Sequence, residues 1–139
     1  VALMEYLVRT YTNEGHTVLD LGTYSTDPVD YPDYAQKLGQ ALQQGQAARG
    51  ILLCGSGVGA AVAANKLPGI RAGLCHDSYS AHQGVEHDDM NVLCLGSEIV
   101  GGALADELVR TFLAARFIGG GRYADRLEKV AELERMADG

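Results

Sequence analysis

The sequence predicts an α/β protein in which helices cover both faces of a parallel β-sheet. Expected strands and helices alternate along the chain, and this order is typical of parallel sheets. Residues 50–54, Gly-Ile-Leu-Leu-Cys, form an uninterrupted apolar run, as in a strand that is buried on both faces. A glycine turn, Gly-Ser-Gly-Val-Gly, follows that run directly. Because 139 residues is the size of one domain, we expect a single three-layer domain over residues 1–139.

The first third of the chain predicts two helices separated by a strand and a loop. Apolar residues at helical spacing predict each helix, and a glycine stands near the end of each. The strand is an apolar segment, and the loop after it holds two prolines and several turn formers. In chain order, these elements cover 1–14 (helix), 17–22 (strand), 23–33 (loop) and 33–46 (helix).

From residue 50 onward a strand followed by a helix occurs three times, and one more helix ends the chain. The expected strands cover 50–54, 70–75 and 91–95. The expected helices cover 60–66, 78–86, 102–117 and 122–137. Three consecutive glycines precede the last helix as a hinge, and we expect its apolar stripe to pack on a partner subunit. That stripe consists of Leu127, Val130, Leu133 and Met136.

Composition excludes several classes of partner. Eleven basic and 18 acidic residues give a formal charge of −7, which disfavours binding to a nucleic-acid backbone. No apolar run approaches the roughly 20 residues that span a bilayer, so we expect no membrane partner. The three cysteines, Cys54, Cys75 and Cys94, form no CxxC pair, which argues against disulfides and structural zinc. We therefore expect reduced thiols in a cytoplasmic protein.

The strongest chemical signal is the glycine turn after Cys54. Ligands of open parallel sheets bind at the carboxyl ends of strands, where free backbone N–H groups favour anions. A thiol beside such N–H groups could act as a base next to an oxyanion site, but a free cysteine is equally often a small core residue. Ser56 could shuttle protons or simply form the turn. Gly55-x-Gly57-x-x-Ala60 also fits a dinucleotide fingerprint formally, although a helix and a strand already precede it.

Two further segments carry candidate groups. Arg122 and Arg126 are four residues apart at the start of the last helix, where a bound anion would relieve the conflict with the helix dipole. A pair of solvated surface arginines is the simpler alternative. His87 precedes the last strand among acidic residues and could transfer protons, although such a histidine is more often a surface residue.

These segments together resemble the type B ribose-5-phosphate isomerase family, which includes the galactose-6-phosphate isomerase subunits. The resemblance lies in four stretches: GTYSTDPVDYPDYA, GILLCGSGVGAAVAANKLPGIRAGLCHDSYSA, EHDDMNVLCLG and GGGRYADR. It implies a three-layer, Rossmann-like parallel sheet and a homodimer or homotetramer whose active sites lie at a subunit interface. It also implies isomerisation of a phosphosugar without metal or cofactor. The first strand of the family, which ends in an Asp-His pair, has no match here, so we expect it to be missing from this chain.

The resemblance also assigns roles to individual residues. Cys54 would move a proton between C1 and C2 through an enediolate, Ser56 would assist proton transfer between the oxygens, and His87 would open the furanose ring. Substrate-binding positions carried over in the same way are Tyr31, Gly55, Gly57, Val58, Gly59, Asp88, Asn91, Arg122 and Arg126. Two residues depart from the pattern: Asp88 stands where many members have asparagine, and Glu98 where many have arginine.

Interconversion of ribose 5-phosphate and ribulose 5-phosphate is the function that the resemblance favours. Within the family, a six-carbon phosphosugar such as galactose or allose 6-phosphate is the alternative. From a different class, the glycine turn could serve a non-catalytic nucleotide- or phosphate-binding module, and the chain could also be an inactive subunit that still assembles.

Overall fold

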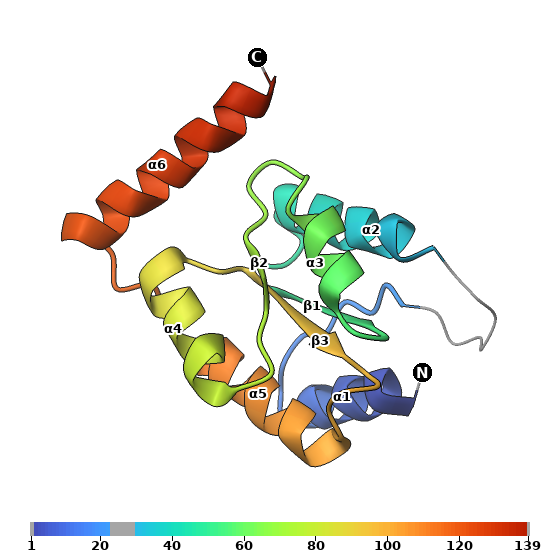
Figure 1. Ribbon diagram of the computed structural model, residues 1–139. Coiled ribbons are helices and arrows are strands. Elements are labelled where there is room, and N and C mark those ends of the chain that lie inside the picture. Colours follow the sequence, from blue (N-terminus) through green and yellow to red (C-terminus); the bar gives the residue numbers. More distant parts are fainter. Residues whose placement is uncertain (1, 23–29, 139) are drawn as a thin grey trace.

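The computed structural model describes residues 2–22 and 30–138, which form three layers around a parallel sheet (Figure 1). The helices are α1 (Ala2–Asn13), α2 (Tyr31–Gln43), α3 (Val58–Ala64), α4 (Ser78–Asp88), α5 (Gly102–Ala114) and α6 (Gly121–Asp138). The strands are β1 (Gly50–Cys54), β2 (Ala72–Leu74) and β3 (Val92–Gly96). The strand order is β1-β3-β2, and both pairs are parallel. The predicted α/β class with a covered parallel sheet is confirmed.

The central strand β3 supplies side chains to two separate cores, one on each face of the sheet. Leu93 and Leu95 belong to the core formed with α1, α4 and α5, whereas Val92 and Cys94 belong to the core formed with α2 and α3. All four residues are fully buried, because successive side chains of a strand point to opposite faces. Such burial on both faces explains why the sequence of β3 is continuously apolar rather than alternating.

The strand expected at 17–22 is wrong. These residues have no regular secondary structure, and Leu19 is 49% exposed. A cavity of about 700 Å³ separates the segment from β1, the strand it would have to approach. Within β1, the backbone groups of Gly50 and Cys54 form hydrogen bonds on the β3 side. Because successive residues of a strand direct their backbone groups to alternate sides, those of Ile51 and Leu53 point toward this cavity. An apolar segment cannot form a strand without a hydrogen-bonded neighbour, and none lies beside this one in the described part of the chain.

Other boundaries move by a few residues for identifiable reasons. Helix α2 begins at Tyr31 rather than at residue 33. The proline that follows Tyr31 is tolerated in the first turn of the helix, because an N–H group at that place would have no partner within the helix. The rest of the expected loop, 23–29, lies outside the described residues. Helix α5 ends at Ala114 rather than 117, where the guanidinium of Arg49 donates to the carbonyls of Phe112, Leu113 and Ala115. These bonds satisfy carbonyls that have no partner within the helix.

Helix α6 projects from one end of the molecule instead of covering the sheet (Figure 1). Its first turn contacts α4, and farther along the carboxylate of Glu134 accepts a hydrogen bond from the N–H of Gly69. Much of the predicted apolar stripe is exposed: Val130 at 49%, Leu133 at 63% and Met136 at 73%. Among the described residues, no helix is both long and apolar enough to cross a membrane.

Candidate active site

The thiol of Cys54 lies at the carboxyl end of β1 and faces the turn that follows. Its Sγ accepts a hydrogen bond of 3.2 Å from the N–H of Gly57, and Cys54 lines the cavity beside β1 together with Gly55, Ser56 and Gly59. Cys54 is partly exposed, whereas Cys75 and Cys94 are buried. Burial raises the pKa of Cys94 to about 12 and also raises the pKa of Cys75, so both stay protonated at neutral pH.

The turn reaches back to the thiol because Gly57 has a backbone conformation that suits only glycine. Its φ is +84°, in the left-handed region. A Cβ at this position would lie 2.5 Å from Cδ1 of Leu74 and 3.0 Å from the carbonyl carbon of Leu95. The turn is therefore pressed against the ends of β2 and β3, and this packing directs the Gly57 N–H at the sulfur.

Replacement of Gly57 by alanine should destabilise the protein. We expect Gly57→Ala to lower the free energy of unfolding by at least about 1–3 kcal/mol, because it combines a strained φ with a backbone clash. Urea unfolding measures this change. Gly101→Ala is the matched control, since Gly101 has φ −84° and open space around its Cα. Equal stability of the two variants would contradict the proposed close packing of the turn.

Three side chains lie in or beside the turn, those of Ser56, Tyr31 and Glu98. Ser56 is exposed, and its Oγ accepts a hydrogen bond of 3.3 Å from the N–H of Val58. The ring of Tyr31 lies against Gly59: a Cβ added to Gly59 would lie only 2.6 Å from Cζ of Tyr31. Tyr31 therefore lies beside the turn, in the first turn of α2, and its contact with substrate stays a prediction. A Cβ added to Gly55 would lie 3.8 Å from a carboxylate oxygen of Glu98, so the Glu98 side chain lies beside the turn.

His76 is a residue near this edge to which the sequence assigned no role. Its Nε2 accepts a hydrogen bond of 2.9 Å from the N–H of Gly96, at the end of β3. The position of His76 directly after a strand was the signal that could have placed it here. Because its Nε2 is held as an acceptor, His76 supports the end of β3 rather than offering that nitrogen to a ligand.

A second group of predicted residues lies around the last turn of α4 and the first turn of α6. The ring of His87 stacks on that of Tyr123, with centroids 4.4 Å apart and an angle of 19° between the planes. Arg122 donates to the hydroxyl of Tyr123 at 3.2 Å. Neither Arg122 nor Arg126 forms an ion pair with a carboxylate in the described part of the chain, and Glu128 pairs with Arg135 instead.

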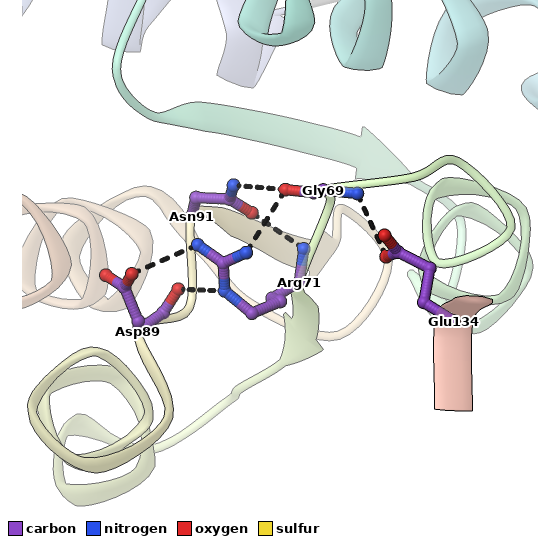
Figure 2. Close-up of polar contacts among 5 residues, drawn as sticks. All are labelled: Gly69, Arg71, Asp89, Asn91 and Glu134. Carbon is purple, nitrogen blue, oxygen red and sulfur yellow. Dashed lines mark hydrogen bonds and ion pairs between the residues drawn. The ribbon is translucent and has the colours of Figure 1, made fainter. Parts of the chain in front are cut away.

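Asp88 and Asn91 lie next to this group but differ in their surroundings. Asp88 is exposed at the end of α4. Asn91 is already bonded to backbone: its Oδ1 accepts from the N–H of Arg71 at 2.7 Å, and its Nδ2 donates to the carbonyl of Gly69 at 2.9 Å (Figure 2). Arg71 in turn pairs with Asp89 at 3.1 Å. Asn91 therefore holds together the beginnings of β2 and β3, and its contact with substrate stays a prediction.

The two groups lie at opposite ends of the sheet. Cys54 aligns with Gly96, the last residue of β3, whereas α4 brings the chain back from His87 to Val92, the first residue of β3. The length of β3 alone corresponds to about 13 Å at 3.3 Å per residue. In Figure 1, α6 begins on the side away from the arrowheads of the strands. One chain therefore presents a thiol half-site, formed by Cys54, Ser56 and the turn, and a separate arginine half-site, formed by His87, Arg122 and Arg126.

The described residues include no cluster of three histidine, cysteine, aspartate or glutamate side chains that could hold a metal ion. What the thiol half-site offers is a sulfur, a hydroxyl and the backbone N–H groups of a tight turn. Such a set suits proton transfer at a carbon atom next to a carbonyl, with the N–H groups near the resulting oxyanion. The fold and this half-site are those of an α/β protein with a candidate site for acid–base chemistry at the carboxyl edge of its sheet.

Comparison with known proteins agrees with this class. The family described as Ribose/Galactose Isomerase matches residues 1–130. A relative from Escherichia coli (strain K12), ribose-5-phosphate isomerase B, is 41% identical over 96% of this chain and 89% of its own length. The solved structure of Clostridium thermocellum ribose-5-phosphate isomerase B is 43% identical with a TM-score of 0.94, covering 98% of this chain and 91% of that one.

A third similar protein is ribose-5-phosphate isomerase B of Mycoplasma genitalium, whose structure contains bound ribulose 5-phosphate. It is 34% identical with a TM-score of 0.91 and covers 97% of this chain and 90% of that one. The chain belongs to the ribose/galactose isomerase family. The resemblance drawn from the sequence motifs is confirmed.

Proposed function

We propose that this enzyme interconverts ribose 5-phosphate and ribulose 5-phosphate through an enediolate, with Cys54 as the base. The observation that carries the proposal is the partly exposed Sγ of Cys54, bonded by the Gly57 N–H at the edge of a cavity. Membership in the family supports it, as do the names of the relatives, one of which holds ribulose 5-phosphate.

The reaction begins with the closed sugar ring. In the furanose of ribose 5-phosphate, O4 is bonded to C1. The C1–O4 bond breaks with its electron pair on O4, which takes a proton from the imidazolium of His87. The hydroxyl on C1 loses its proton to water and becomes the aldehyde, so charge and atoms balance. A histidine suits this step because its side chain exchanges protons near neutral pH.

Isomerisation of the open chain then takes place at the thiol half-site. The thiolate of Cys54 removes the proton from C2, and the electron pair of that C–H bond forms a double bond between C1 and C2. Negative charge moves to O1, and in this proposal the N–H groups of the turn, from Gly55, Gly57, Val58 and Gly59, stabilise it once the substrate oxygen takes the place of their present partners. The hydroxyl of Ser56 passes a proton from O2 to O1, and Cys54 returns its proton to C1 to complete the ketose.

The complete site requires two copies of the chain in this proposal. The phosphate is to be held by Arg122 and Arg126, which offer planar donors without a competing carboxylate among the described residues. Because these arginines and His87 lie at the far end of the sheet from Cys54, each half-site is completed by the opposite half-site of a partner. A homodimer or homotetramer with α6 packed on the partner fits the exposed apolar stripe. The expected compartment is the cytoplasm.

Removal of one arginine should weaken binding of the phosphosugar. Loss of charge-assisted hydrogen bonds to phosphate is expected to raise KM for ribose 5-phosphate by about 10- to 100-fold in Arg126→Ala, with a smaller change in kcat. Steady-state assay of ribulose 5-phosphate formation measures both constants. Arg135→Ala is the matched control, because Arg135 lies on the same helix and pairs with Glu128.

Two outcomes would reject the assignment. If the purified protein converts a six-carbon phosphosugar but not ribose 5-phosphate, the proposed substrate is wrong. If Arg126→Ala and Arg135→Ala behave alike, the arginine half-site does not bind the phosphate.

A further inference from the structure

The side chain of His87 is held on two sides by residues to which no role has been assigned. Gln83 lies one turn earlier on α4, at the spacing that places two side chains on one helix face. Its Nε2 is 2.8 Å from Nδ1 of His87. From α6, Tyr123 stacks against the imidazole at 4.4 Å between centroids. The imidazole is thus fixed by a hydrogen bond from Gln83 of the same helix and by stacking on the Tyr123 ring of α6.

The bond to Gln83 holds the Nδ1 edge of the His87 ring. An amide nitrogen only donates, so Nδ1 accepts and the proton of the neutral imidazole sits on Nε2. In the described part of the chain, Nε2 itself has no hydrogen-bond partner, which leaves it available to a substrate. When His87 is protonated at both nitrogens, rotation of the Gln83 amide presents its oxygen to the Nδ1–H instead. Transfer of the Nε2 proton from this imidazolium to the substrate leaves the Nδ1–H form, whose Nδ1–H the Gln83 oxygen still accepts, so the same side chain can support His87 before and after the transfer.

The contact with Tyr123 depends on how α6 leaves the molecule. The N–H of Ile118 donates to the carbonyl of Glu86 at 3.0 Å, which fixes the linker on the last turn of α4. Gly119, Gly120 and Gly121 all have positive φ, and this turn directs the start of α6 back over His87. The guanidinium of Arg122 lies 5.1 Å from the Tyr123 ring, so one turn of helix joins the histidine to a phosphate-binding candidate.

We propose that Gln83 and Tyr123 are positioning residues that orient His87 for opening of the sugar ring. The inference rests on the proposed function, in which His87 acts on O4 of a furanose. An aldose phosphate of four carbons cannot form that ring, because its O4 carries the phosphate. Its isomerisation needs the thiol half-site and the phosphate grip but no ring opening. Loss of Gln83 or Tyr123 should therefore impair the five-carbon substrate selectively.

The kinetic test compares two substrates. Gln83→Met removes the hydrogen bond, Tyr123→Leu removes the stacked ring, and Tyr123→Phe keeps it. We expect the first two to lower the ratio of kcat/KM for ribose 5-phosphate to kcat/KM for erythrose 4-phosphate by about 10- to 100-fold, as for a misplaced catalytic group. Tyr123→Phe should restore the ratio. The matched control is Tyr79→Leu, since Tyr79 is an exposed tyrosine of α4 that contacts His82 instead.

A spectroscopic test needs no substrate. Nitrogen-15 NMR of the histidine side chains, with the His87 signal assigned by its loss in His87→Gln, reports which ring nitrogen is protonated. We expect the Nε2–H form in the unmodified protein and a mixture of the two neutral forms in Gln83→Met. An unchanged His87 signal in Gln83→Met, or an equal fall in turnover of both sugars, would overturn the proposal. If neither sugar is isomerised by the unmodified protein, the proposed function has failed, and the NMR result alone decides whether Gln83 positions His87.

Discussion

Cys54→Ala is expected to lower kcat for ribose 5-phosphate by about 10²- to 10⁴-fold, the usual contribution of a positioned general base. The variant removes the only cysteine sulfur that is not buried, and it leaves a small residue at the edge of a cavity. The fold should therefore survive. Assay of isomerisation together with a thermal unfolding curve separates loss of the base from loss of the structure.

The other cysteines provide the matched control. Cys75→Ala removes a buried thiol whose pKa is raised by its burial. Because that thiol lies in the core, turnover per folded molecule should be retained. Alkylation with iodoacetamide under native conditions should modify Cys54 first and abolish activity in parallel. Full turnover by Cys54→Ala would mean that another group removes the proton from C2.

Local signals were sufficient to predict the elements around the thiol half-site. The apolar run that ends at Cys54 and the glycines after it specify a buried strand, a tight turn and a helix, and the structure has all three. The strand expected at 17–22 failed because a strand depends on its neighbour. Its apolar residues face a cavity beside β1 rather than another backbone, so the same sequence pattern produced no ladder.

The separation of the two half-sites could have been derived from the order of elements alone. In a parallel sheet, residues after a strand lie at its carboxyl edge, and residues just before a strand lie at its amino edge. Cys54 is the last residue of β1, whereas His87 precedes β3, so they belong to opposite edges. The stacking of Tyr123 on His87 could not be predicted, because it depends on the three positive φ angles of the glycine linker and on where that linker crosses α4.

Two inactive variants should restore activity when they assemble together. Cys54→Ala lacks a working thiol half-site, and His87→Gln lacks a working arginine half-site. If each site combines the thiol half-site of one chain with the arginine half-site of its partner, a mixed pair holds one site with both defects and one site with neither. Random assembly makes half of the pairs mixed, so co-expression should give about one quarter of the activity of the unmodified enzyme.

This result depends on where the two half-sites lie and not on the strength of any single contact. Co-expression of Cys54→Ala with Ser56→Ala is the matched control: both changes damage the same half-site, so every site in a mixed pair carries one defect and no activity should return. If co-expression of Cys54→Ala with His87→Gln gives no more activity than the two variants give separately, Cys54 and His87 of one chain lie in the same site. Since β3 separates those residues along its whole length, that outcome would require a rearrangement of the sheet itself.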